Sequence, residues 1–271
     1  LCAPIIMGKL RIPHIVGMVL AGVAIGKYGL HILERDTSFE LFGKVGLYYI
    51  LFLAALEMDI EGLKKNKFRF VIFGFVTFLL PFFLTFYSSL YLLSLSPTTS
   101  LLMACIMSSH TLIGYPIVSR FGLQRKTPVM LAVGSTMISL LMALLVLAAI
   151  VASSNGTSGP MFWVVFLLKF ALFCCFLTLA IPRLCRWFLR RYSDSVMQFI
   201  FVLAIMFLSA ALSQMIGLEG IFGAFLAGLI LNRYIPSVSP LMNRLEFIGN
   251  ALFIPYFLIS VGMLIDITVL Y

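Results

Sequence analysis

A chain of 271 residues in which 62% are hydrophobic and only 11% are charged is too apolar to fold as an ordinary soluble protein. Its net charge of +9 comes from basic residues in short connections between apolar stretches, a distribution that argues against a nucleic-acid-binding surface. The apolar stretches recur along the whole chain, and most are long enough to cross the ~30 Å hydrocarbon core of a bilayer. The sequence therefore predicts an all-α, polytopic membrane helix bundle.

About ten membrane spans are predicted, the first of them incomplete. Residues 1–8 form the tail of span one, and the others follow at roughly 15–30, 41–59, 68–93, 101–120, 128–152, 161–189, 196–216, 221–231 and 247–271. Gly17, Gly22 and Gly26 in span two are spaced to allow close helix approach. The connection at 217–220 is so short that spans eight and nine should form a tight hairpin. Pro255 is expected to kink or interrupt span ten.

Basic residues predict the orientation of the spans. Of the 19 Lys and Arg residues, 15 lie in the connections that follow spans one, three, five, seven and nine. The positive-inside rule places these connections, including the clusters at 64–69 and 183–191, in the cytoplasm. The beginning of span one and the end of span ten are then outside.

Span five is interrupted near its middle by polar and helix-breaking residues: Ser108, Ser109, His110, Thr111, Gly114, Tyr115 and Pro116. Pro116 lacks an amide hydrogen and disfavours helical geometry at the preceding residue, while Gly114 accepts almost any backbone angle. Freed backbone groups survive at membrane depth only where they face protein or a water-filled cavity, as they do at the ion sites of transporters. The sequence predicts a discontinuous helix here.

Two interpretations remain open for the polar residues near this break. The hydroxyls of Ser109, Thr111, Thr136 and Ser139 could ligate a cation, or they could bond their own helix and join neighbouring helices. Thr136 and Ser139 lie three residues apart on one face of span six, which could meet the broken segment. His110 could bind a proton near neutral pH, or it could be a neutral imidazole bonded to unwound backbone.

Five strings, in this order, resemble the monovalent cation:proton antiporters of the Kef-type and plant CHX-type branch. They are RIPHIVG at 11–17, LAALEMD at 53–59, SSHT through PIVSRFG at 108–122, GLE with GAFLAGL at 217–229, and PYFLISVGM at 255–263. The resemblance covers nearly the whole chain. It implies the sodium/hydrogen exchanger transmembrane fold, with about thirteen helices in two inverted repeats. Residues 1–271 would then be a partial transport domain without the last three helices.

The resemblance also implies a function. We expect a secondary transporter, not an enzyme, that exchanges sodium or potassium for protons by alternating access and needs no cofactor or bound metal. Its partners would be the lipid bilayer, monovalent cations, protons and a second copy in a homodimer, without nucleic acid. Its location would be a bacterial cytoplasmic membrane. Pro255, Ser260 and Gly262 would belong to a later core helix.

One position departs from the family pattern. Relatives carry an ion- and proton-binding Asp in the helix after the broken one, and the alignment places Leu140 there. The sequence has no Asp or Glu between Glu61 and Asp194. The alternative interpretation is therefore a non-transporting membrane sensor or scaffold with the antiporter architecture. We expect Leu140 to face the gap beside the broken helix, where a carboxylate would be tolerated.

Overall fold

The computed structural model describes residues 14–33, 36–58, 60, 65, 67–109, 118, 121–123, 126–154, 160–192, 194–236 and 238–266. Within these ranges the regular structure is helical and no strand occurs, which confirms the predicted all-α class. The elements are α2 (His14–Ile25), α3 (Thr37–Glu57), α5 (Lys67–Tyr91), α6 (Pro97–Ser108), α8 (Thr127–Ser154), α9 (Pro160–Arg191), α10 (Ser195–Met215), α11 (Gly220–Leu231), α12 (Pro240–Ile248), the π-helical turn η1 (Gly249–Phe253) and α13 (Ile254–Gly262).

The described helices have the lengths of an integral, multi-pass membrane protein. Six segments are long and apolar enough to cross a bilayer, namely α3, α5, α10, most of α8 and α9, and the continuous stretch Pro240–Gly262. Three shorter apolar helices, α2, α6 and α11, accompany them. Helices thus occur at the positions of predicted spans two to ten. Span one and the second half of span five lie outside the described residues.

The last of these segments begins earlier than the sequence predicted. Helix α12 starts at Pro240 instead of near residue 247, because Ser239 caps it and accepts the Met242 amide at 3.1 Å. Helical structure continues through Pro255, and the local irregularity is the π-helical turn that precedes this proline. In that turn the Ile254 amide reaches back five residues to the Gly249 carbonyl oxygen. Tyr49 of α3 contacts both sides of this segment, since its hydroxyl donates to the Leu245 carbonyl oxygen of α12 at 2.8 Å and its ring stacks on Phe253 of η1 with centroids 4.5 Å apart.

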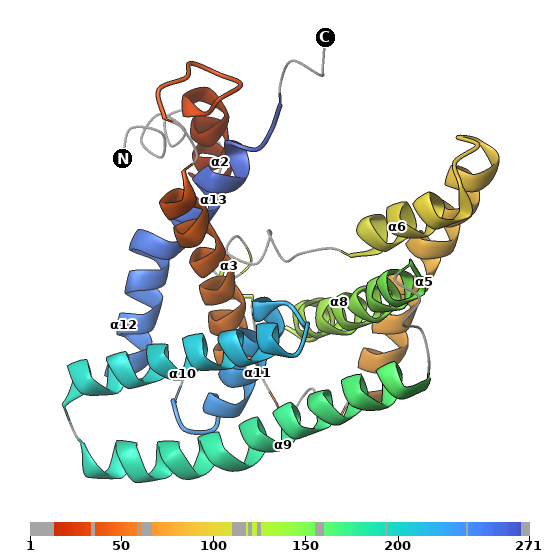
Figure 1. Ribbon diagram of the computed structural model, residues 1–271. Helices are drawn as coiled ribbons and strands as arrows, with labels where there is room; N and C mark the ends of the chain where they lie inside the picture. The colour runs from red at the N-terminus through yellow and green to blue at the C-terminus, as the bar shows by residue number, and fades with distance from the viewer. Residues whose placement is uncertain are drawn as a thin grey trace.

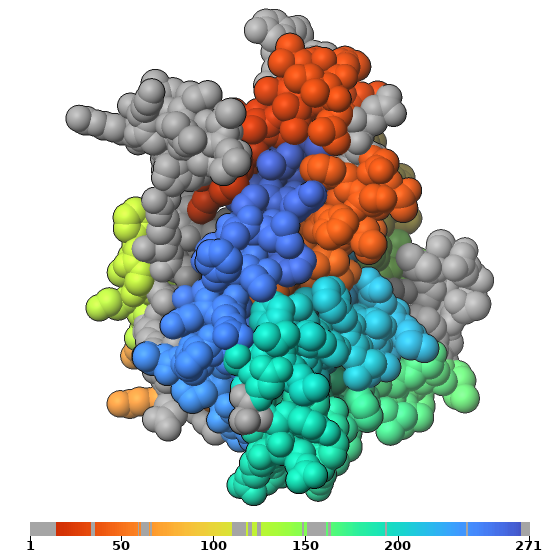
Figure 2. All heavy atoms as spheres, turned by 90° about the vertical axis from the view of Figure 1, so that its left-hand side faces the viewer, coloured from red at the N-terminus to blue at the C-terminus, as the bar shows by residue number. Residues whose placement is uncertain are grey.

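The described helices form two groups (Figure 1). Helices α5, α6 and α8 pack on one another at one side of the molecule, and we call them the three-helix bundle. The remaining elements, α2, α3 and α9 to α13 with η1, pack together and form what we call the scaffold. Figure 2 shows part of the scaffold, with α3 beside α12 and α13 and with α10 below them. Between the described residues of the two groups, contact is sparse and is made mainly through α8.

Small residues let the scaffold helices approach closely, as predicted for α2. A Cβ atom on Gly22 would lie 2.2 Å from the Ile259 carbonyl oxygen, and one on Gly262 would lie 2.1 Å from the Val19 carbonyl oxygen. Backbone therefore touches backbone where α2 crosses α13.

The tight hairpin of α10 and α11 is confirmed. Gly217 has a φ of +93°, a left-handed conformation that favours glycine. Ser213 then closes the turn by donating its hydroxyl to the Glu219 carbonyl oxygen at 2.8 Å.

Candidate ion-binding region

The hydroxyl of Ser139 lies in the interface between α8 and α5. It donates to the Gly74 carbonyl oxygen at 3.3 Å and lies 3.2 Å from the Thr77 hydroxyl oxygen. Thr77 Oγ1 in turn lies 2.8 Å from the Phe73 carbonyl oxygen of its own helix. Ser139 is fully buried, so these bonds satisfy it without water. The Ser139 side chain thus links α8 to α5 within the three-helix bundle.

Thr136 makes a different bond from Ser139. Its hydroxyl donates to the Ala132 carbonyl oxygen at 2.9 Å, four residues back in α8, and Ser135 donates to the same oxygen at 2.9 Å. This is the local back-bonding that buried hydroxyls adopt inside apolar helices. In the described structure Thr136 and Ser139 thus bond to backbone carbonyl oxygens, and their role as cation ligands stays a prediction.

Helix α6 brings Ser109 to the edge of the predicted break. Ser109 ends the helix with an extended backbone, and its amide donates to the Cys105 carbonyl oxygen at 3.2 Å. Cys105 attaches this end of α6 to α8, because its sulfur lies 3.0 Å from the Ala143 carbonyl oxygen. The other members of the predicted break, His110, Thr111, Gly114, Tyr115 and Pro116, lie outside the described residues.

Leu140 is only 6% exposed and faces the scaffold. It belongs to the α8 face formed with Met130, Val133 and Met137, whose spacing follows the helical repeat. This face joins one apolar cluster with residues from three scaffold helices: Ile50, Leu51, Ala54, Ala55 and Met58 of α3, Ile221 and Phe225 of α11, and Ile254, Phe257 and Leu258 of α13. The hydrophobic side chains that pack with Leu140 thus come from the scaffold. Residues 110–117, the broken segment beside which we expected Leu140, lie outside the described residues, so that expectation stays a prediction.

The predicted residues of the later core helix lie in the scaffold, away from the hydroxyls of α8. Ser260 is buried against α3, where a Cβ atom on Gly43 would lie 2.5 Å from its Oγ. Gly262 lies at the crossing with α2, and Pro255 follows the π-helical turn. The structure therefore places the predicted site residues on both sides of the apolar contact between bundle and scaffold.

Sequence reasoning did not select Glu57, at the end of α3, or Asn232, which follows α11, as site residues. Glu57 is 7% exposed and is the one buried carboxylate within the described ranges. Beside it, the side-chain amide of Asn232 donates to the carbonyl oxygens of Ala55, Leu56 and Met58 at 3.2, 2.6 and 2.8 Å. The position of Glu57 at the end of a long apolar helix was a usable signal, since buried charges in membrane helices are costly. Asn232 caps the end of α3 through a contact between helices that are far apart in the sequence, so local pattern gave no signal for it.

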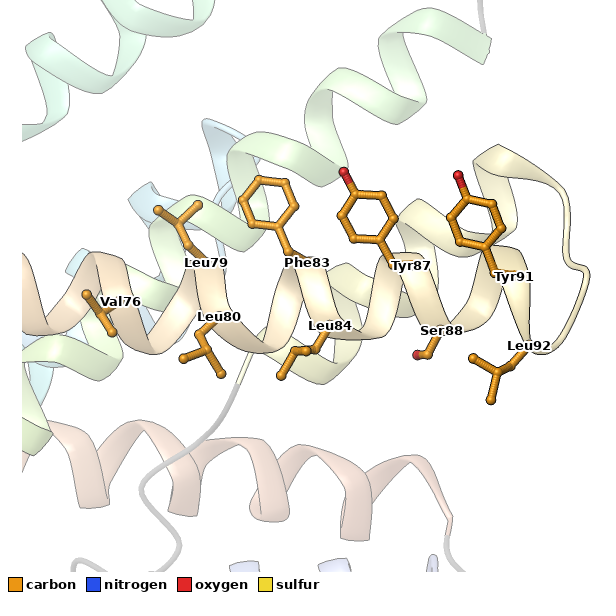
Figure 3. Close-up of a pocket in the computed structure, with 9 residues that line it drawn as sticks. All are labelled: Val76, Leu79, Leu80, Phe83, Leu84, Tyr87, Ser88, Tyr91 and Leu92. Atoms are coloured by element: carbon orange, nitrogen blue, oxygen red, sulfur yellow. The ribbon is translucent and has the colours of Figure 1, made fainter.

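The outer surface of α5 is apolar. Phe78 and Phe82 pack into the three-helix bundle, while an open groove of about 710 Å³ runs along the opposite face. In Figure 3 Phe83, Tyr87 and Tyr91 project to one side of this helix, and Leu80, Leu84 and Leu92 project to the other. The phenylalanines of α5 thus divide between helix packing and an exposed apolar surface suited to lipid.

Comparison with known families identifies the architecture. The family model described as "Sodium/hydrogen exchanger, transmembrane" matches residues 1–271. The chain belongs to this family. It is 37% identical over 269 residues to the Na+/H+ antiporter NhaS5 of Synechocystis sp., a match that covers 98% of this chain and 38% of NhaS5. It is 31% identical to the probable Na+/H+ antiporter 3 of Methanocaldococcus jannaschii, over 99% of this chain and 69% of that protein.

A solved structure shows the same fold. The sodium proton antiporter MjNhaP1 of Methanocaldococcus jannaschii superposes with a TM-score of 0.62 at 19% identity, over 99% of this chain and 68% of that one. The helical arrangement of this sodium/hydrogen exchanger family member is therefore an antiporter fold. The expected resemblance and fold class are confirmed, and the family is one of transporters.

Proposed function

We propose that this chain forms the membrane part of a monovalent cation:proton antiporter that exchanges sodium or potassium for protons by alternating access. The observation that carries the proposal is the division of an antiporter fold into a three-helix bundle and a scaffold with sparse contacts between them. Two bodies that touch through one apolar face can move relative to each other without breaking buried hydrogen bonds.

The face of α8 suits such movement. Methionine side chains at Met130 and Met137 are flexible, and they contact apolar scaffold residues without polar bonds that would fix one position. The polar contacts of α8, in contrast, go to α5 and α6 inside the bundle. A displacement between the two groups would therefore leave the bundle intact.

The proposed ion-handling groups are those of the predicted break. Because the chain has no carboxylate between Glu61 and Asp194, we assign proton binding to His110 and cation contacts to Ser109, Thr111 and the freed backbone carbonyls. The transported ions are then the only small molecules needed, with no resident cofactor or metal. We further propose that the whole protein is a homodimer in a bacterial cytoplasmic membrane.

Transport by the whole protein in proteoliposomes tests this function. An imposed sodium or potassium gradient should change the internal pH, reported by an enclosed dye, and His110→Ala should reduce the exchange rate at least about tenfold. The control is His31→Asn, since His31 is exposed and has a φ of 53° that asparagine tolerates. Absence of any cation-driven pH change in the unsubstituted protein would contradict antiport. Full exchange by His110→Ala would remove that residue from the mechanism and leave antiport standing.

A further inference from the structure

The last turns of α9 carry a hollow of about 560 Å³ that is lined by four arginines and one tryptophan: Arg183, Arg186, Trp187, Arg190 and Arg191. Their spacing of i, i+3, i+4, i+7 and i+8 places all five on one helical face. All five side chains are exposed. The basic residues that the sequence explained as topology signals therefore form one continuous surface.

This surface faces away from the rest of the protein. Helix α9 packs on the scaffold through a different face, with Leu177, Ile181 and Cys185 buried at intervals of four residues. Near the end of α9, Phe188 continues that packing by stacking on Phe201 of α10, with ring centroids 4.1 Å apart. The described helices therefore leave the arginine face uncovered.

The depth of this surface matches the level of lipid headgroups. Helix α9 has 32 residues, about 48 Å at 1.5 Å per residue, which exceeds the ~30 Å hydrocarbon core. A helix of this length reaches beyond the core, and its basic residues at 183–191 place the last turns in the interface. Trp187 and Tyr192, with ring centroids 6.3 Å apart, are the residue types that mark this level.

The four positive charges are not neutralised within the described part of the chain. No described carboxylate forms an ion pair with any of them, and nearby Asp194 caps α10 by accepting the Val196 amide at 3.2 Å. Two guanidinium groups are already held in place. Arg183 Nη1 donates to the Leu179 carbonyl oxygen at 2.7 Å, and Arg186 Nε donates to the Pro182 carbonyl oxygen at 3.3 Å. Such anchoring lowers the entropy lost when an anion binds.

A second, mainly apolar hollow of about 330 Å³ adjoins the arginines. Its walls come from α9, the end of α11 and the segment after α3: Ile60, Thr178, Pro182, Leu229, Ile230, Arg233 and Tyr234. Pro182 links the two hollows, because it lines this one and accepts the bond from Arg186. An anionic group and an apolar chain would thus find adjacent places on the same helix.

We propose that the arginine face of α9 binds the phosphodiester group of an anionic phospholipid, with an acyl chain along the neighbouring apolar hollow. One planar guanidinium group can donate two parallel N–H bonds to two oxygens of the same phosphate group. The ammonium group of lysine does not reproduce this bidentate geometry. Clusters of basic residues at the cytoplasmic interface attract anionic headgroups.

Quenching of Trp187 fluorescence by brominated lipids tests the proposal without measuring transport. Residues 1–271 contain two tryptophans, so Trp163→Phe leaves Trp187 as the only reporter among them, and any tryptophan elsewhere in the whole protein is also replaced by phenylalanine. The protein is reconstituted with phosphatidylglycerol or phosphatidylcholine that carry identical dibrominated chains. We expect half-maximal quenching at a roughly fivefold lower mole fraction of phosphatidylglycerol, the factor that one basic residue contributes at an anionic surface.

Replacing all four arginines by lysine keeps the charge that directs insertion but removes the planar guanidinium groups. It should reduce the preference for phosphatidylglycerol over phosphatidylcholine below about twofold. If that variant is poorly folded, Arg186→Lys with Arg190→Lys gives the same test. Removing charge elsewhere on the same side, by Lys67→Gln with Arg69→Gln, should leave the preference unchanged. Equal quenching by the two lipids, or an unchanged preference in the lysine variants, would overturn the site. Loss of the preference when inorganic phosphate is added would show a soluble anion site instead of a lipid site.

Discussion

Leu140→Asp is the substitution for which sequence and structure give opposite expectations. The family alignment suggested that a carboxylate here would enter a polar gap. The structure instead buries Leu140 to 6% exposure in the apolar contact between the three-helix bundle and the scaffold. Truncating a buried leucine costs about 2–5 kcal/mol, and an Asp at the centre of a membrane helix costs about 2.5–3.5 kcal/mol on insertion scales. Against a total stability of about 5–15 kcal/mol, we expect Leu140→Asp to unfold or strongly destabilise the protein.

Thermal unfolding in detergent, followed by size-exclusion chromatography, measures this loss. We expect the midpoint to fall by more than about 10 °C, since 1 kcal/mol shifts Tm by about 2–4 °C in chains of 150–250 residues. Leu140→Met is the matched control, because it conserves volume and should cost less than about 1.5 kcal/mol. Leu140→Asn separates charge from polarity. A Leu140→Asp protein as stable as the methionine variant would refute the apolar environment and restore the polar gap.

Three further predictions follow from helix contacts and topology. Gly22→Ala should lower the free energy of unfolding by about 2–3 kcal/mol, because its Cβ atom would lie 2.2 Å from the Ile259 carbonyl oxygen and the helices must separate. Ala24→Val, at an exposed position, should change it by less than about 0.5 kcal/mol. Denaturation of both variants measures the difference. Asn232→Ala should cost about 1–3 kcal/mol by leaving carbonyl oxygens at the end of α3 without donors, and Asn232→Asp, which replaces donors with acceptors, should be no more stable in the same assay. A cysteine at Lys65 should react with an impermeant reagent only from the cytoplasm and one at Leu92 only from outside; labelling of both from one side would contradict the predicted orientation.

Hydrophobic patterning predicted the helices of the described ranges and most of their bounds, although α12 begins at Pro240 and not near residue 247. A stretch of about twenty apolar residues cannot leave its backbone groups unpaired in lipid, so length and composition by themselves require a helix. Short connections, glycine spacing and prolines added local detail. They predicted the α10–α11 hairpin, the close approach at Gly22 and the irregular turn before Pro255. The five family strings predicted the antiporter fold.

Only the tertiary structure decided which neighbour each side chain meets. Ser139 and Leu140 are adjacent in the sequence, yet one bonds to α5 inside the bundle and the other packs on the scaffold. The periodicity of α8 shows that the two residues point in different directions, but it does not show which helix lies in each direction. For the same reason the sequence did not reveal that Asn232 reaches the end of α3. Such contacts join residues far apart in the chain, so local pattern carries no information about them.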